Sequence, residues 1–309
     1  MISVTLFDYS VDLLLTLDDY ETNFTLENQY VNLAATAACM FAALWVLQLA
    51  AYLFYSTLGG EVFGPYRHRV LFGRHTMDAA AMLIMSYMGY ESLTNFGGFD
   101  AFPSLAMPNG TIAAVGAERA YAFSAAAQRL CTMQVAYEIK NFCDSVIHND
   151  GWIFLIHHTV TCLLAALSLR PFLHLYCAYF LGWSEISTAV LCILVLFDEE
   201  RGVPPLAKAA PILMKATGVA FASTFILFRI IIWPYVNYFY WKDMIHMWNA
   251  DSFHSIPVAC TYMFVNIGLT VLQVVWLGEI IQTAMKLFGE EGGGLSIKRG
   301  DDDETKKTK

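Results

Sequence analysis

Charged residues are scarce in this sequence, and their scarcity excludes most soluble folds. Only 15 % of its 309 residues are Asp, Glu, Lys or Arg, against about 25 % in soluble globular domains. The formal net charge is −9, and the body of the chain contains no basic cluster. These two features argue against nucleic-acid binding.

Several catalytic and structural signatures are also missing. The sequence has no phosphate-binding P-loop and no Gly-x-Ser-x-Gly nucleophile motif,. Its eight histidines do not form repeated boxes, and a metal site needs three or four converging ligands,. We therefore expect neither a metal nor a bound cofactor. The seven cysteines all lie in apolar stretches, which argues against a disulfide scaffold,.

Hydrophobic residues, in contrast, are abundant and occur in long runs. They make up 57 % of the chain, and 18 or more apolar residues in helical form can cross a bilayer core of about 30 Å. Five runs are clear and two are weaker: 32–58, 151–170, 172–197, 211–239 and 255–288, then 76–93 and 120–147. The sequence therefore predicts an all-α, polytopic membrane protein with about seven transmembrane helices. Pro234 is expected to kink the helix that contains it.

The distribution of basic residues predicts the orientation, because cytosolic loops retain Lys and Arg. The first 66 residues contain neither. Ten basic residues fall on one side of the predicted topology and three on the other. The ten are Arg67, Arg69, Arg74, Arg201, Lys208, Lys298, Arg299, Lys306, Lys307 and Lys309, and the three are Arg119, Arg170 and Lys242. We expect a lumenal N-terminus and a cytosolic C-terminus.

Short motifs near the two ends of the chain agree with this orientation. The N-x-[ST] sequons at Asn23 and Asn109 both fall on the predicted lumenal side, where glycosylation is possible,. Lys306 and Lys307 have the dilysine form that cytosolic retrieval coats recognise. They predict residence in the endoplasmic reticulum membrane and a coat partner, although a solvated charged tail is the alternative. Residues 1–30 do not have the pattern of a cleaved signal peptide.

Polar side chains inside the predicted spans are the candidate functional residues, since a charge at mid-bilayer costs at least about 2.5–3.5 kcal/mol. They form stripes at helical spacing. The stripes are His157, Thr161 and Ser168 with His158 adjacent, then Glu185 and Thr188, then Arg229 alone, then Asn266, Thr270 and Gln273.

Three interpretations of these stripes stay open. Hydrogen bonds between helices are common in membranes and suffice to explain the stripe from Asn266 to Gln273. Arg229 requires a buried ion pair, and Glu185, Glu138 and Asp144 are its candidate partners. Adjacent histidines near a carboxylate could instead move protons at neutral pH.

Four segments carry a resemblance to a known family. They are Ile156–Ser168, Leu181–Val190, Phe228–Pro234 and Val265–Ile281. Their order and spacing resemble the TLC-domain family over about residues 75–288. The resemblance implies six transmembrane helices around a long apolar cavity, preceded here by one extra helix. The domains expected are an acidic lumenal N-terminus (1–30), the extra helix with a cytosolic loop (31–74), the TLC domain (75–288) and a charged cytosolic tail (289–309).

The family includes ceramide synthases, which join an acyl chain from acyl-CoA to a sphingoid base. It also includes regulators of membrane composition, secretory-cargo receptors and translocon-associated proteins. The synthase signature H-H-x-x-T-x-x-L-x-x-x-S is matched by His157, His158, Thr161, Leu164 and Ser168. Further along, the signature has His-Asp, Asp and Leu-Glu, where this chain has Ser184-Glu185, Thr188 and Leu191-Cys192. The chain therefore looks closer to the branch without ceramide-synthase activity.

The resulting expectation is a TLC protein that binds a membrane lipid and affects membrane lipid composition. The polar end of its cavity is expected to be lined by Thr161, Ser168, Thr188, Arg229, Asn266 and Gln273. The alternative is an N-acyltransferase that uses acyl-CoA as co-substrate, with His157 or His158 as general base and Glu185 orienting it. A secretory-cargo or translocon accessory role is a further alternative.

Overall fold

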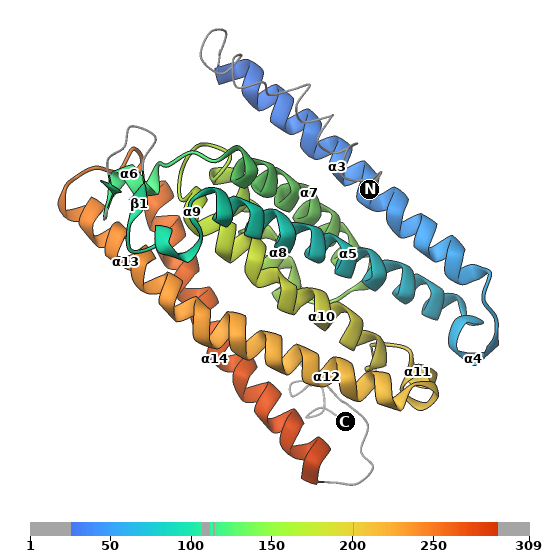
Figure 1. Ribbon diagram of the computed structural model, residues 1–309. Coiled ribbons are helices and arrows are strands. Elements are labelled where there is room, and N and C mark those ends of the chain that lie inside the picture. Colours follow the sequence, from blue (N-terminus) through green and yellow to red (C-terminus); the bar gives the residue numbers. More distant parts are fainter. Residues whose placement is uncertain (1–25, 107–111, 114, 200, 290–309) are drawn as a thin grey trace, which may run out of the picture.

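The computed structural model describes residues 26–106, 112–113, 115–199 and 201–289, and these residues are mostly helical (Figure 1). The predicted all-α class is confirmed. The longer helices are α3 (Leu26–Ser56), α5 (Tyr66–Asn95), α7 (Ala125–His148), α8 (Trp152–Leu167), α10 (Ile186–Leu194), α12 (Pro211–Phe225), α13 (Trp233–Asn249) and α14 (Ile256–Gly289).

Short elements connect or extend these helices. They are α4 (Gly60–Phe63), α6 (Ala117–Ala120), α9 (His174–Cys177), α11 (Pro204–Ala209), the 3-10 turns η1 (Gly98–Ala101), η3 (Trp183–Glu185) and η4 (Val195–Phe197), and the π-helical turns η2 (Ala178–Gly182) and η5 (Ile226–Ile232). A two-residue strand β1 (Leu105–Ala106) pairs antiparallel with β2 (Ile112–Ala113).

Among the described residues, four helical stretches are long and apolar enough to cross a membrane. They are Val31–Ser56, His174–Phe197, Pro211–Asn249 and Ile256–Gln282. α8 is apolar but only 16 residues long, about 24 Å at the rise of an α-helix. α5 and α7 cover the two weaker predicted runs. In the part of the chain that the structure describes, each of the seven predicted runs is therefore helical.

Two helices extend beyond their predicted ends. α5 begins at Tyr66 rather than at residue 76, because its first turns carry Arg67, Arg69 and Arg74 and so have no apolar signal. The stretch that begins at Pro211 continues to residue 249 rather than 239. Its last turns are amphipathic, and they bury one face in the aromatic core.

Pro234 does not end this long helix. A proline has no N–H and cannot bond the carbonyl four residues back. The π-helical turn η5 stands directly before it, and α13 then begins at Trp233 with the proline in its first turn. A π-turn of this kind accommodates the interrupted hydrogen-bond ladder.

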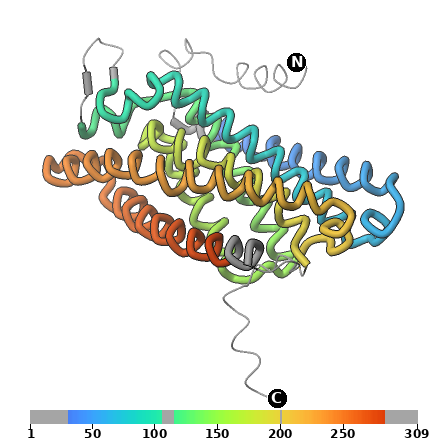
Figure 2. Tube along the Cα trace, turned by 60° about the horizontal axis from the view of Figure 1, so that its bottom comes forward, coloured from blue at the N-terminus to red at the C-terminus, as the bar shows by residue number. Residues whose placement is uncertain are grey.

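The helices form a layered bundle (Figures 1 and 2). α3 lies on one flank against α5 and α7, while α10 joins α5 to α12, and α14 contacts α8 and η5. A methionine-rich core fills the space between α3, α5 and α7. A second core of aromatic side chains joins α9 and η2 to α13 and α14; it includes Tyr176, Tyr179, Trp233, Tyr240 and Tyr262.

α5 and η2 cross with their backbones in contact at Gly89 and Gly182. A Cβ atom added at Gly89 would lie 2.3 Å from the amide nitrogen of Trp183 and 2.6 Å from the Cα of Gly182. These are backbone atoms, so no side chain can move aside to make room. The crossing therefore requires glycine.

We expect Gly89→Ala to destabilise the bundle by about 1–3 kcal/mol or more, because inserting a methyl group forces the two backbones apart. Thermal unfolding of the detergent-solubilised protein measures the loss. Gly218→Ala on α12 is the matched control, since a Cβ there meets nothing within 4 Å. Equal melting temperatures for the two variants would contradict the crossing.

Candidate functional site

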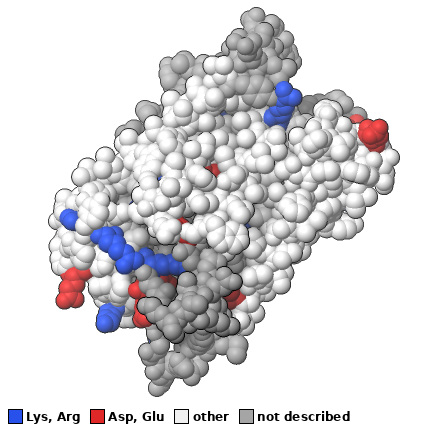
Figure 3. Space-filling model, turned by 180° about the vertical axis from the view of Figure 1, so that it is seen from behind, with Lys and Arg blue, Asp and Glu red and all other residues white. Residues whose placement is uncertain are grey.

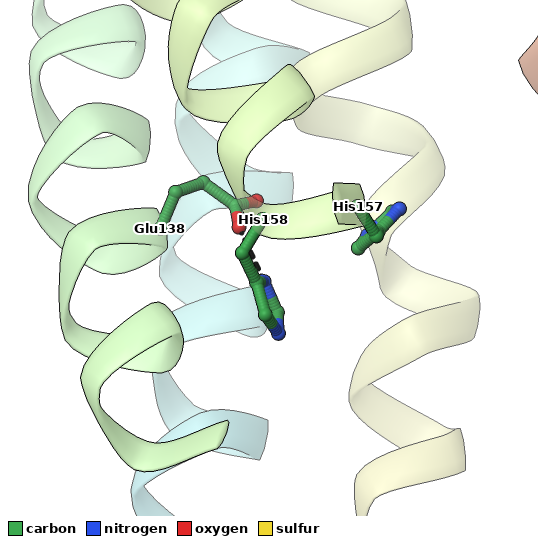
Figure 4. A group of neighbouring side chains, drawn as sticks. All are labelled: Glu138, His157 and His158. Carbon is green, nitrogen blue, oxygen red and sulfur yellow. Dashed lines mark hydrogen bonds and ion pairs between the residues drawn. The ribbon is translucent and has the colours of Figure 1, made fainter. Parts of the chain in front are cut away.

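A histidine–glutamate pair links α7 to α8 (Figure 4). His158 Nδ1 lies 2.6 Å from Glu138 Oε2, and Gln134 Nε2 donates to the other carboxylate oxygen at 2.7 Å. Only 2 % of Glu138 is exposed. When His158 is neutral and donates from Nδ1 to the carboxylate, its Nε2 is left as an acceptor. The pair therefore has the arrangement of a general base and the group that orients it.

His157 lies beside this pair but is not part of it. Its ring centroid is 5.4 Å from that of His158, and Figure 4 marks no hydrogen bond between it and Glu138. Its ring is half-buried. Among the described residues, nothing forms a hydrogen bond with its ring nitrogens. His157 is therefore a half-buried polar group beside charged neighbours, and the described residues leave its hydrogen-bonding capacity unused.

The same three residues could hold a metal ion. One nitrogen of each histidine and one oxygen of Glu138 lie within 4.8 Å of one another. Three such ligands and an open position make a zinc site of the catalytic type. The absence of a metal, expected from the sequence, stays a prediction. Sequence spacing alone could not reveal this cluster, because Glu138 comes from a different helix.

Arg229 is paired with Glu185, one of its three candidate partners. Its Nη2 donates to Glu185 Oε1 at 3.0 Å and to Thr188 Oγ1 at 3.2 Å, and its Nε donates to Ser187 Oγ at 3.2 Å. The guanidinium also lies 5.5 Å from the centre of the Trp233 ring, within the range of a cation–π contact. In this structure Glu185 is bonded to Arg229, and the carboxylate bonded to a histidine is that of Glu138.

The remaining predicted site residues lie in other surroundings. Thr161 bonds the backbone carbonyl of His157 in its own helix, and Ser168 bonds Cys177 and Tyr262. On α14, Asn266 accepts a hydrogen bond from the indole of Trp241 at 3.0 Å. Gln273 is 3 % exposed, and its Oε1 has no hydrogen-bond partner among the described residues. Of the uncharged residues that were predicted to line the cavity, Thr188 is thus the one that bonds Arg229.

An apolar cavity lies between α8, the α9–η2 segment, α13 and α14. Its lining residues are Leu164, Leu173, Tyr176, Cys177, Phe180, Leu181, Trp233, Tyr240, Tyr262, Asn266 and Leu269. Its volume is about 40 Å³, while one water requires roughly 10–15 Å³ of such space. It therefore admits a few atoms of a ligand and not a whole acyl chain.

Sequence reasoning missed a buried ion-pair network between α5 and α7. Lys140 is fully buried, and its Nζ lies 2.6 Å from Asp144 and 3.0 Å from Asp78. Arg74 lies 2.6 Å from Asp150 in the loop after α7. The sequence did contain a sign of this network. Arg74 and Asp78 on α5, and Lys140 and Asp144 on α7, are each four residues apart and so share a helix face,.

The Asp150 carboxyl at the edge of this network has a lowered pKa. Burial acts to raise it, but the hydrogen bond and charge of Arg74 outweigh burial, so the pKa lies below its ordinary value of 3.8. The pair therefore stabilises the fold above that value. Its contribution is lost as the pH falls through the lowered pKa.

Charged side chains on the outer surface gather near the ends of the bundle. The face in Figure 3 is mostly uncharged across its middle, as a surface in contact with hydrocarbon requires. The glycosylation candidates Asn23 and Asn109 and the retrieval residues Lys306 and Lys307 lie outside the described residues, so these sites stay predictions.

We expect Lys140→Met to lower the free energy of unfolding by about 3–5 kcal/mol, because it leaves buried carboxylates without their cation. Arg129→Met is the matched control. Arg129 is partly exposed and lies 3.7 Å from a more exposed Glu91, so its loss is worth at most about 1 kcal/mol. Denaturation in mixed micelles measures both. A Lys140 variant as stable as the control would show that the network is dispensable.

Comparison with known proteins agrees with the fold. The sequence matches the TLC domain family over residues 9–282. This range includes α3, and the domain boundary at residue 75 stays a prediction. No curated protein and no solved structure matches the chain. Since the match covers most of the sequence, the chain belongs to the TLC-domain family, whose members are helical membrane proteins related to lipid metabolism.

Proposed function

We propose that this protein binds a lipid of the endoplasmic reticulum membrane and thereby affects membrane lipid composition. In this proposal His157 contacts the polar end of the lipid. The observation that carries it is the unused hydrogen-bonding capacity of the His157 ring next to two satisfied pairs, His158–Glu138 and Arg229–Glu185. The ring is half-buried, so a lipid headgroup could reach it and supply the hydrogen-bond partner that its nitrogens lack among the described residues.

The acyl chain of this lipid would lie along the outside of α8 rather than inside the bundle. The internal cavity of about 40 Å³ is too narrow for it. Ile156 and Leu163 are seven residues apart and so share one face of α8, beside the face of His157, and their side chains are 53 % and 46 % exposed. An extended chain against these residues would remain in the hydrocarbon layer while its polar end reaches His157.

A second candidate function is acyl transfer from acyl-CoA to a sphingoid base. The 2.6 Å contact between His158 and Glu138 favours it, because a carboxylate that orients a histidine is typical of a general base. The step also requires a group that stabilises the thioester oxyanion. Arg229 is the buried cation of the neighbouring pair, but it is already bonded to Glu185, so this candidate stays second.

Lipids that copurify with the wild type and with His157→Ala test the proposal. We expect the variant to retain about 2- to 10-fold less lipid in quantitative mass spectrometry, the equivalent of one lost hydrogen bond. Thr159→Ala is the control, because the exposed Thr159 bonds only its own helix. Equal lipid content in all three proteins would contradict the role of His157.

An acyl-transfer assay with long-chain acyl-CoA and a sphingoid base decides between the two candidates. We expect no turnover by the wild type. Turnover that disappears in the His157→Ala/His158→Ala double variant, with the fold preserved, would establish the enzyme and replace the first proposal.

Substitution of the two lysines tests whether the protein resides in the endoplasmic reticulum membrane. We expect Lys306→Ser/Lys307→Ser to move the protein out of the endoplasmic reticulum toward later compartments, because a retrieval coat would no longer recognise its tail. Imaging of the tagged protein in cells measures this. An unchanged distribution would show that the dilysine is a solvated tail and no retrieval signal.

A further inference from the structure

Three metal-ligating side chains from two helices meet near one end of the bundle. One nitrogen each of His157 and His158 and one oxygen of Glu138 lie within 4.8 Å of one another. α8 begins at Trp152, so the two histidines follow its start by about 8–9 Å at the rise of an α-helix. Trp152 is 62 % exposed. An ion therefore has a short path to the three side chains from the loop before α8.

The distances between these atoms lie on both sides of those in a zinc site. Zinc binds histidine nitrogen and carboxylate oxygen at about 2.0–2.2 Å, so neighbouring ligand atoms of a tetrahedral site are about 3.3–3.5 Å apart. His158 Nδ1 and Glu138 Oε2 are closer than this, at 2.6 Å, and all the atoms lie within 4.8 Å. No described residue bonds the half-buried ring of His157. Rotation of side chains is therefore sufficient to reach the spacing that zinc requires.

The carboxylate of Glu138 is held as a ligand would be. Gln134 Nε2 donates to Oε1 at 2.7 Å, which leaves Oε2 for a metal. Carboxylates that bind metals are usually fixed by an outer hydrogen bond of this kind. His158 faces Oε2 with Nδ1, and a neutral imidazole whose hydrogen is on Nε2 presents a lone pair at Nδ1. A change of tautomer thus prepares His158 for a metal.

We propose that Glu138, His157 and His158 bind one Zn²⁺ and leave its fourth position open. Two imidazoles and one carboxylate suit zinc, whereas calcium and magnesium prefer oxygen ligands throughout. Three protein ligands with an open position are typical of zinc sites that bind a further molecule. The proposal departs from the absence of a metal that the sequence predicts. That expectation rested on the pattern of histidines along the chain, and the third ligand comes from another helix.

The open position gives the metal a place in lipid binding, and this part of the inference rests on the proposed function. Zn²⁺ with the single charge of Glu138 is a net cation, so it favours a negatively charged or strongly polar oxygen. An oxygen of the lipid headgroup in the fourth position would lie about 3.3–3.5 Å from the ligand nitrogen of His157. The lipid would then bind through the metal at the place where the proposed function puts its polar end.

Titration of the full-length protein with Zn²⁺ tests the site. The protein is purified in detergent through a tag without histidine and dialysed free of metal, and binding is measured by calorimetry. We expect one zinc per chain. Glu138→Gln retains the size of the side chain and an acceptor oxygen but removes the charge. It should weaken zinc binding by more than about 100-fold, since loss of an outer-shell partner alone costs about 10–100-fold.

His157→Ala is the second test variant, because its ring bonds no described residue and its removal is expected to preserve the fold. His148→Ala is the matched control: His148 is an exposed histidine near the same end of the bundle and outside the three ligands. It should bind zinc as the wild type does. Zinc should also raise the melting temperature of the wild type and of His148→Ala, but not that of the two ligand variants.

Two results would overturn the metal site. One is a wild type that binds no zinc, and the other is zinc binding of equal strength in the wild type, Glu138→Gln and His157→Ala, which would be adventitious. Removal of zinc with a chelator separates the site from the proposed function. Lipid that copurifies without any zinc would leave lipid binding and remove the metal site, whereas bound zinc without copurified lipid would remove the proposed function and leave the metal site.

Discussion

The pairing of charges between helices is the constraint on which the rest of this structure depends. Lys140 and Arg229 are buried in the helical bundle, and each has a carboxylate within 3.0 Å. Removing one partner leaves an uncompensated buried charge, which is strongly destabilising. The rotation of α5, α7, α10 and η5 about their axes is therefore set by these pairs. Close crossings such as Gly89 against Gly182 then set the helix separation.

Beside the satisfied pairs, the ring of His157 is the informative group. It is half-buried, it lies next to the His158–Glu138 and Arg229–Glu185 pairs, and no described residue bonds its nitrogens. A ligand atom at this position would therefore be stabilising. A family that hosts enzymes, regulators and receptors on one fold gives no function by itself, so this position carries the functional proposal.

Much of the fold could be predicted from the sequence, because long apolar runs have few alternatives to transmembrane helices. The beginning of α5 could not, since its charged first turns remove the apolar signal. Partners across helices were also beyond sequence reasoning. The stripes at residues 157, 185 and 229 follow from spacing, but the pairing of His158 with Glu138 instead of Glu185 depends on how α7 and α8 are rotated. Spacing within one helix contains no information on that rotation.

The measurement that tests the central claim most directly is a cryo-electron microscopy structure of the protein in lipid nanodiscs, with a bound antibody fragment to aid alignment. The account predicts elongated lipid density along α8, with its polar end within hydrogen-bonding distance of the His157 ring. A well-resolved map in which His157 bonds only protein or water, with no lipid density beside it, would contradict the account.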